Sequence, residues 1–288
     1  MSILEVKNLT HTYDGNTPFF SDAVKDVSFS VEKGEIIGII GHTGSGKSTL
    51  VQHLNGLLKP TSGEIILNGE NIWKNSKNIR KIRSQVGLVF QYPEYQLFED
   101  TVYKDIAFGP KNMGLSDNEI DFRIKEICEL VGIKEEYLEK SPFDLSGGEK
   151  RRVAIAGVMA MQPDIIVFDE PVAGLDPKGR ADVVKMISDY RKKYNATVFV
   201  ISHNMEDMAL IADKLIVMNK GELVLFDKTE NVFKQYELLK TIGLNVPMVT
   251  QIFLILKEKG MNIPDNIFTV DTAVEYLLSI YKGGNSNA

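Results

Sequence analysis

Several features that mark particular classes of protein are scarce in this sequence. The chain has 288 residues and one cysteine, Cys128. It can therefore form no internal disulfide, as is usual in a reducing compartment. No cysteines and histidines cluster with the spacing of a metal site. No apolar run approaches the roughly 18 residues that span a bilayer. We therefore do not expect a disulfide-stabilised domain, a zinc domain or a membrane-spanning chain.

Positive charge is also limited. There are 33 lysines and arginines against 39 acidic residues, so the formal net charge is −6, which argues against a broad nucleic-acid surface. The first seven residues lack the apolar region of a signal peptide, and we expect no export signal. A chain of this kind would need a partner to hold it at a membrane.

A glycine-rich loop is the strongest motif that is present. It follows the apolar run 36–40 and precedes a predicted helix, Ser48 to Leu57; its residues are Gly41, His42, Thr43, Gly44, Ser45, Gly46, Lys47, Ser48 and Thr49. Strand, glycine loop and helix form a phosphate-binding loop, in which backbone N–H groups and the positive helix end face phosphates. Lys47 would reach the β- and γ-phosphates, and the Ser48 hydroxyl would ligate Mg²⁺. The sequence therefore predicts binding of a nucleoside triphosphate.

Four apolar runs end in polar residues. These runs precede the phosphate loop, Gln91, the pair Asp169-Glu170 and the pair Ser202-His203. Continuous apolar runs between helices indicate buried parallel strands, and ligands bind beyond the carboxyl ends of such strands. We therefore expect these polar residues to face one crevice.

Charge suggests a role for each polar residue, beside a plainer alternative. Asp169 would help to hold Mg²⁺, and Glu170 would orient the attacking water; the alternative is a solvated acidic pair. Gln91 would contact Mg²⁺ or water, or be a polar loop residue. His203 would hydrogen-bond the γ-phosphate, or have a structural role.

A second glycine-containing segment begins a predicted helix over Lys150 to Met161. Ser146 and Glu149 fit a capping box, which explains them structurally. Gly147 and Gly148, however, destabilise a first helical turn by about 1 kcal/mol each. An anion that approaches the backbone there would explain both glycines.

The remaining elements are predicted from periodicity and turn residues. Alternating strands are expected at 4–9 and 24–31, with a turn at 14–16 and a hairpin at Asn68-Gly69. Tyr13, just past the first strand, would stack on a purine or pack on its own sheet. Basic residues near Trp73, including Lys77, would face lipid headgroups or simply be solvated.

An amphipathic helix over 117–131 would contribute to a helical subdomain at about 96–160. Three helices over 229–242, 246–259 and 272–281 would form a C-terminal extension, 229–288, with a flexible end at 283–288.

These motifs, in this order, resemble the ATP-binding subunits of ABC transporters over about residues 3 to 225. The resemblance implies an α/β P-loop fold in residues 1–228, with a mostly parallel sheet, an antiparallel β subdomain and a helical subdomain. It implies a head-to-tail dimer in which ATP lies between the phosphate loop of one domain and Ser146-Gly147-Gly148 of the other. Glu170 would be the catalytic base, His203 the γ-phosphate sensor, Tyr13 the base-stacking residue and Asp176 a residue of the dimer seam. Gln91 would pass the signal to a membrane partner.

Finer features resemble the second A-type ATPase of energy-coupling factor (ECF) transporters. The segments that carry this resemblance are 91–98, 101–110, 151–157 and 174–180. It implies a peripheral protein on the cytoplasmic face of the membrane, with a second ATPase, a transmembrane T component and a substrate-binding S component, importing vitamins or transition-metal ions. Val172 and Glu149 depart from the usual residues. The alternative is a soluble ABC-type ATPase acting on nucleic acid or the ribosome.

Overall fold

The computed structural model describes residues 2–13, 21–74 and 79–284. Its larger sheet has the strand order β10-β9-β3-β8-β7-β6. The strands are β3 (Ile36–Ile40), β6 (Val86–Val89), β7 (Ile165–Asp169), β8 (Thr197–Ile201), β9 (Lys214–Asn219) and β10 (Glu222–Lys228). All neighbours pair in parallel except β9 and β10. The four apolar runs are therefore buried parallel strands, as predicted, and their carboxyl ends meet at one edge.

The smaller sheet is antiparallel and has the order β2-β1-β4-β5. It comprises β1 (Ser2–Tyr13), β2 (Ser21–Glu32), β4 (Ser62–Leu67) and β5 (Glu70–Asn71). The hairpin at Asn68-Gly69 is confirmed. Tyr13 is the last residue of β1, and does not follow it, because the strand continues far enough to pair Tyr13 with Ser21. The predicted turn at 14–16 lies outside the described residues.

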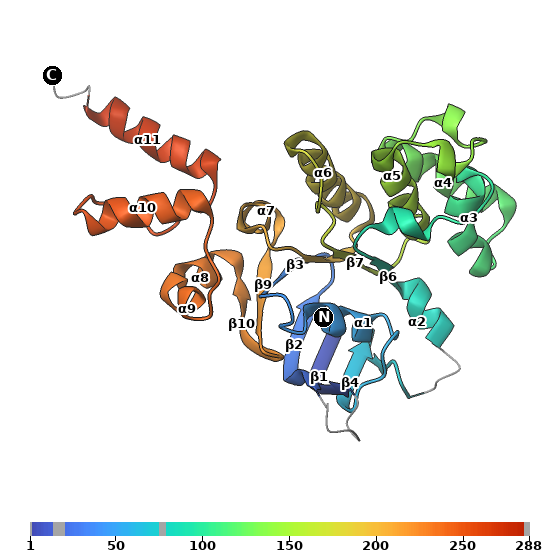
Figure 1. Cartoon of the computed structure of the whole chain (residues 1–288), viewed down its shortest axis with the longest axis horizontal. Helices are drawn as coiled ribbons and strands as arrows, with labels where there is room; N and C mark the ends of the chain where they lie inside the picture. The colour runs from blue at the N-terminus through green and yellow to red at the C-terminus, as the bar shows by residue number, and fades with distance from the viewer. Residues whose placement is uncertain (1, 14–20, 75–78, 285–288) are drawn as a thin grey trace.

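Helices flank the two sheets (Figure 1). The phosphate loop leads into α1 (Lys47–Leu54), α2 (Ile79–Gln85) precedes β6, and α6 (Pro177–Tyr194) and α7 (Met205–Ile211) lie on either side of β8 in the chain. A separate group contains α3 (Val102–Asn112), α4 (Asp117–Val131) and α5 (Gly147–Met159), which contact one another. Short 3-10 turns η2 (Pro93–Gln96), η3 (Glu135–Tyr137) and η4 (Pro142–Asp144) connect this group.

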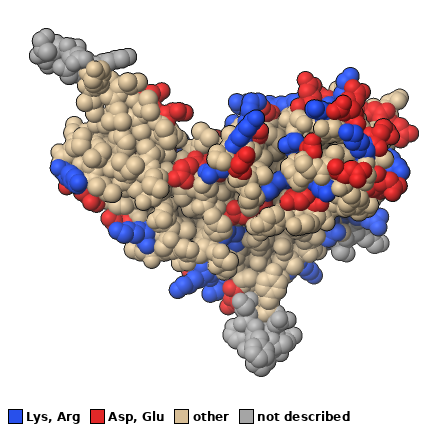
Figure 2. Space-filling view, turned by 45° about the horizontal axis from the view of Figure 1, so that its top comes forward, with Lys and Arg blue, Asp and Glu red and all other residues tan. Residues whose placement is uncertain are grey.

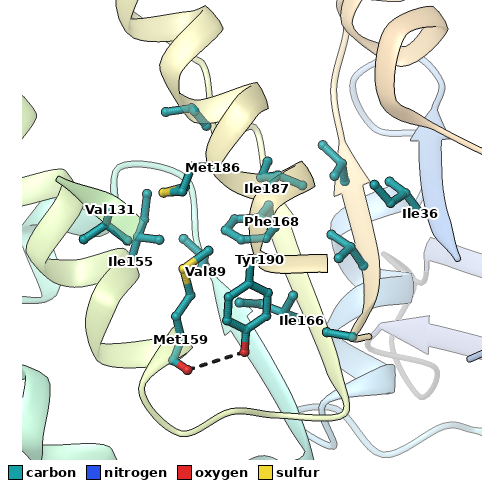
Figure 3. Close-up of a cluster of buried hydrophobic side chains, with 14 of the residues drawn as sticks. Ile36, Val89, Val131, Ile155, Met159, Ile166, Phe168, Met186, Ile187 and Tyr190 are labelled. Atoms are coloured by element: carbon teal, nitrogen blue, oxygen red, sulfur yellow. Dashed lines mark hydrogen bonds between the residues drawn. The ribbon is translucent and has the colours of Figure 1, made fainter. Parts of the chain in front are cut away.

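One apolar cluster joins the helical group to the larger sheet (Figure 3). Tyr190 of α6 is fully buried and donates a hydrogen bond from its hydroxyl to the Met159 carbonyl of α5 at 3.4 Å. Phe168 of β7 lies between these helices. Cys128 of α4 belongs to the same cluster, and burial raises the pKa of its thiol to about 11. Cys128 therefore packs in the core.

The C-terminal extension contains four helices where three were predicted. They are α8 (Thr229–Lys234), α9 (Tyr236–Thr241), α10 (Met248–Glu258) and α11 (Val270–Gly284). The helical backbone is interrupted between α8 and α9 at Gln235, whose ψ is 40°. Helix α11 includes Gly283 and Gly284, which were predicted as part of a flexible end; residues 285–288 lie outside the described part.

Packing divides this extension in two. Buried residues of its first part join the main core: Val232, Phe233, Leu239, Leu244 and Val246. Helices α10 and α11 form a small core of their own around Phe253, and extend away from the sheets (Figure 1). In the ranges that the structure describes, no helix is long and apolar enough to cross a membrane.

Candidate nucleotide site

The phosphate loop has a backbone that only glycine adopts readily. Gly41, Gly44 and Gly46 have φ values of 156°, 78° and 99°. A Cβ on Gly46 would lie 2.2 Å from the Ala23 carbonyl oxygen, whereas a Cβ on Gly44 would meet no atom within 4 Å. The side chain of Ser45 is buried, and its hydroxyl has no partner among the described residues. The loop therefore offers open space beside Gly44, with an unpaired hydroxyl behind it.

The Lys47 side chain folds back onto the phosphate loop. Its Nζ donates to the carbonyl oxygens of Gly41 at 2.7 Å and His42 at 2.8 Å. Burial lowers the pKa of Lys47, while the charges of Glu170 and Asp169 oppose that change. The ammonium group therefore lies in the field of both carboxylates at the sheet edge, where it can meet phosphate oxygens.

Asp169 and Ser48 meet at the end of β7. The Ser48 hydroxyl donates to the Asp169 carboxylate, which lowers the pKa of that carboxyl, although burial raises it by more. A hydroxyl beside a carboxylate is an oxygen donor set that suits Mg²⁺. No group of three or more histidine, cysteine or acidic side chains with metal-site geometry occurs in the described ranges. The two oxygens fit a cation that is completed by water and phosphate.

Glu170 and His203 face each other across the neighbouring strand ends. His203 Nε2 lies 3.1 Å from Glu170 Oε1, and the Glu170 side chain is only 14% exposed. Burial and the charge of Asp169 raise the pKa of Glu170 to about 7. Burial and the Lys47 charge lower the pKa of His203. A carboxyl group with a pKa near neutrality can accept a proton from water.

Arg151 supports Glu170 in a way that the sequence did not predict. Its guanidinium donates to the carbonyl oxygens of Ala173 at 2.9 Å and Glu170 at 3.3 Å. Glu170 itself has a φ of 50°, which is unusual for a residue with a side chain. The buried arginine thus ties α5 to this turn. The only sequence signal was a charged residue next to the apolar positions of α5.

Tyr13 lies at the outer margin of the phosphate loop. Its side chain is 39% exposed, and its hydroxyl lies 3.4 Å from Thr49 Oγ1. The His11 ring contacts both Tyr13 and His53 edge-on, with centroids 4.5 and 4.6 Å away. The Tyr13 ring therefore packs against His11 and stays partly exposed.

Further predicted residues lie at or just beyond the ends of other elements. Ser146 is the N-cap of α5, in the helical group, where the Glu149 carboxylate accepts from its backbone N–H at 2.9 Å and its hydroxyl at 2.5 Å. This confirms the capping box; Gly147 has open space around it. Asp176 caps α6 by accepting from the Gly179 N–H at 2.7 Å. Gln91 is exposed, two residues beyond β6.

The chain resembles known proteins throughout its length. A family described as ABC transporter matches residues 24–173. The Energy-coupling factor transporter ATP-binding protein EcfA2 of Clostridium tetani is 52% identical, over 99% of both chains. The protein of the same name from Clostridium perfringens is 54% identical, over 98% of this chain and 99% of the relative.

Solved structures agree with these sequence relatives. The structure of cbiO1 from Clostridium perfringens, described as part of the ABC transporter complex cbiONQ, has a TM-score of 0.74 and 35% identity, over 89% of this chain and 99% of that one. A dimeric ATP-binding cassette, MJ0796, bound to ADP and Pi, has a TM-score of 0.70 and 28% identity, over 78% of this chain and 98% of that one. The P-loop fold predicted from sequence is thereby confirmed. The chain belongs to the ABC transporter family, among the ATP-binding proteins of energy-coupling factor transporters, and is an ATPase coupled to transport.

Proposed function

We propose that two such ATPase domains pair head to tail, so that each ATP lies between the phosphate loop of one and the Ser146 segment of the other. The observation that carries this proposal is that the predicted site residues lie in two separate parts of the chain's fold. Lys47, Asp169, Glu170 and His203 converge at one sheet edge, whereas Ser146 begins α5 in the helical group. The dimeric, ADP-bound relative supports this arrangement.

The residues at the sheet edge would then divide the reaction between them. The phosphate-loop amides and Lys47 hold the β- and γ-phosphates. Glu170 orients the attacking water and accepts its proton, for which its pKa of about 7 is suited. His203 donates from its ring to a γ-phosphate oxygen. Mg²⁺, held by Ser48, Asp169 and Gln91, would neutralise phosphate charge. The Tyr13 ring would stack on adenine.

A groove that includes residues 96–98, a few positions beyond Gln91, suits the membrane partner. It has a volume of about 930 Å³ and is lined by the segment 96–98, by α3 and α5, and by the basic side chains of α2. Phe98 and Phe108 stack edge-on in its wall, with centroids 4.9 Å apart, and are 57% and 46% exposed. An amphipathic helix of a transmembrane subunit would bury these rings. The segment that begins at Gln91 would connect this helix to the γ-phosphate.

The complete assembly would be an ECF-type importer of vitamins or transition-metal ions. Its other members would be a paralogous ATPase, a transmembrane T component and a substrate-binding S component, with this chain on the cytoplasmic face of the membrane. The relatives named as ECF transporter ATP-binding proteins support this proposal. The apolar faces of α10 and α11 would help to join the two ATPases.

A tagged pull-down from gently solubilised native membranes tests this function. We expect a second ATPase, a T-type membrane protein and a small membrane substrate binder to copurify. Recovery of ribosomes or DNA-repair proteins, with nothing from the membrane, would contradict the importer.

The same pull-down tests the groove. Phe98→Asp should release the membrane subunits, because a carboxylate cannot be buried against an apolar helix without a large penalty. Phe122→Asp is a matched control, since Phe122 is 63% exposed and lies outside the groove. Equal recovery with both variants would exclude the groove as the docking site.

A further inference from the structure

The C-terminal extension contacts the phosphate loop directly. His42 Nε2 lies 2.7 Å from the carbonyl oxygen of Ile242, at the end of α9. A carbonyl oxygen only accepts hydrogen bonds, so the Nε2 nitrogen must carry the proton. The backbone carbonyl of His42 accepts in turn from Lys47 Nζ at 2.8 Å. A continuous path of hydrogen bonds therefore runs from the extension, through His42, to Lys47 of the phosphate loop.

A second contact joins the same segment to the helix after His203. The Met248 N–H, at the start of α10, donates to Glu206 Oε1 of α7 at 3.0 Å. Glu206 lies three residues beyond His203. The segment 242–248 is thus bound at one end to the phosphate loop and at the other to α7, the helix that follows His203.

Burial holds this segment in position. Leu244 and Val246 are 6% and 5% exposed and belong to the main apolar cluster. Gln251 of α10 donates from its side chain to the Val246 carbonyl at 2.8 Å, which fixes the segment to that helix. Gly243 touches the histidine ring so closely that a Cβ there would lie 2.8 Å from His42 Nε2. A shift of His42 therefore has to move the segment or break the contact.

We propose that residues 242–248 couple nucleotide binding at the phosphate loop to the conformation of helices α10 and α11. We call this segment the link. His42 is the positioning residue of this link on the loop side, and Glu206 is its counterpart beside His203. The link rests on nucleotide binding at this loop, but not on import or on any particular cargo. Because coupling between sites is reciprocal, changes in the extension must alter nucleotide affinity.

Gly243→Ala tests the link without replacing a residue of the phosphate loop. Gly243 and Gly260 both have positive φ, 73° and 90°, but a Cβ on Gly260 would meet no atom within 4 Å. We expect Gly243→Ala to weaken ADP binding to the full chain about fivefold in calorimetric titration, as the loss of one hydrogen bond would. Gly260→Ala should stay within about twofold, because it brings the same backbone strain without the contact.

Hydrogen exchange supplies the second measurement. ADP should slow amide exchange in α10 of the unaltered chain, and this protection should be lost in Gly243→Ala and in Glu206→Ala. Equal ADP affinities for Gly243→Ala and Gly260→Ala, with unchanged protection of α10, would overturn the link. Failure of the unaltered chain to bind ADP would instead overturn the nucleotide site itself.

Discussion

Glu170 is the residue whose surroundings most clearly suggest catalysis. It is largely buried beside Asp169, and its backbone carbonyl accepts a hydrogen bond from Arg151. Glu170→Gln keeps the shape of the side chain but cannot accept a proton, so ATP turnover should fall by about 10² or more while ATP binding persists. Phosphate release and nucleotide titration measure the two effects. Glu129→Gln, on the exposed side of α4, should change neither, and normal turnover in Glu170→Gln would exclude this role.

His53 gives the chain a predictable response to acid. The side chain is fully buried, its Nδ1 donates to the Thr49 carbonyl oxygen at 2.7 Å, and burial lowers its pKa to about 4. The unfolded chain, with a histidine pKa near 6.5, therefore binds more protons between these values, and stability falls as the pH falls through this window.

The change attributable to His53 should be about 2 kcal/mol between pH 7 and pH 5. Urea unfolding at both pH values measures it. His53→Asn, which retains an N–H donor but does not titrate, should lose this part of the pH dependence. An identical pH dependence in the variant would show that other groups cause it.

At the scale of elements, Arg180 joins α6 to α7. Its Nε lies 2.9 Å from both carboxylate oxygens of Asp207, whose side chain is only 10% exposed. Burial raises the pKa of Asp207, while the hydrogen bond and charge of Arg180 lower it. Arg180→Met would leave the carboxylate without its partner, and should destabilise the chain by about 2 kcal/mol, allowing for solvent at the arginine.

The double variant Arg180→Met with Asp207→Leu separates the pair from the packing. It should recover most of the stability in urea unfolding, because no unpaired charge remains. If both variants lose the same free energy, the unpaired charge of Asp207 is not the cause of the loss.

The elements that could be predicted from sequence are those fixed by local pattern. The four apolar runs indicated parallel strands because such strands are buried on both faces. Helix α4 was predicted with the right ends from its apolar spacing. The strand order was not predictable, since β9 enters beside β3 through pairing of residues far apart in the chain. The break at Gln235 was also missed, because it contains no glycine or proline.

The candidate site likewise has residues that could be predicted from sequence and residues that could not. A phosphate loop is a contiguous motif, and Asp169, Glu170 and His203 could be placed because strand ends meet at one edge. The support of Glu170 by Arg151 and the contact of His42 with Ile242 depend on tertiary packing. The last pair is separated by 200 residues, and neither residue type indicates the other.

At the scale of the whole molecule, α10 and α11 carry an apolar surface that the described part of the fold leaves uncovered. Met248, Ile252 and Ile255 form a stripe on α10, and Val274, Leu277, Leu278 and Tyr281 form another on α11; all are at least 47% exposed. Charged side chains are sparse over this part of the chain (Figure 2). Contiguous apolar faces of this kind commonly mark interfaces. Residues of α8 and α9 belong to the main core, so deletion of 230–288 would damage folding. A substitution on α11 is therefore a cleaner test of whether this surface is an interface.

Leu277→Asp should weaken pairing with the partner ATPase about tenfold or more, since it places a carboxylate where apolar surface must be buried. Ser279→Asp adds the same charge to the same helix outside the stripe, and should leave pairing unchanged. Light scattering across a range of concentrations measures assembly with the ATPase recovered in the pull-down. Unchanged assembly in Leu277→Asp would mean that the two ATPases join through their nucleotide sites alone, and that the apolar stripe serves another contact.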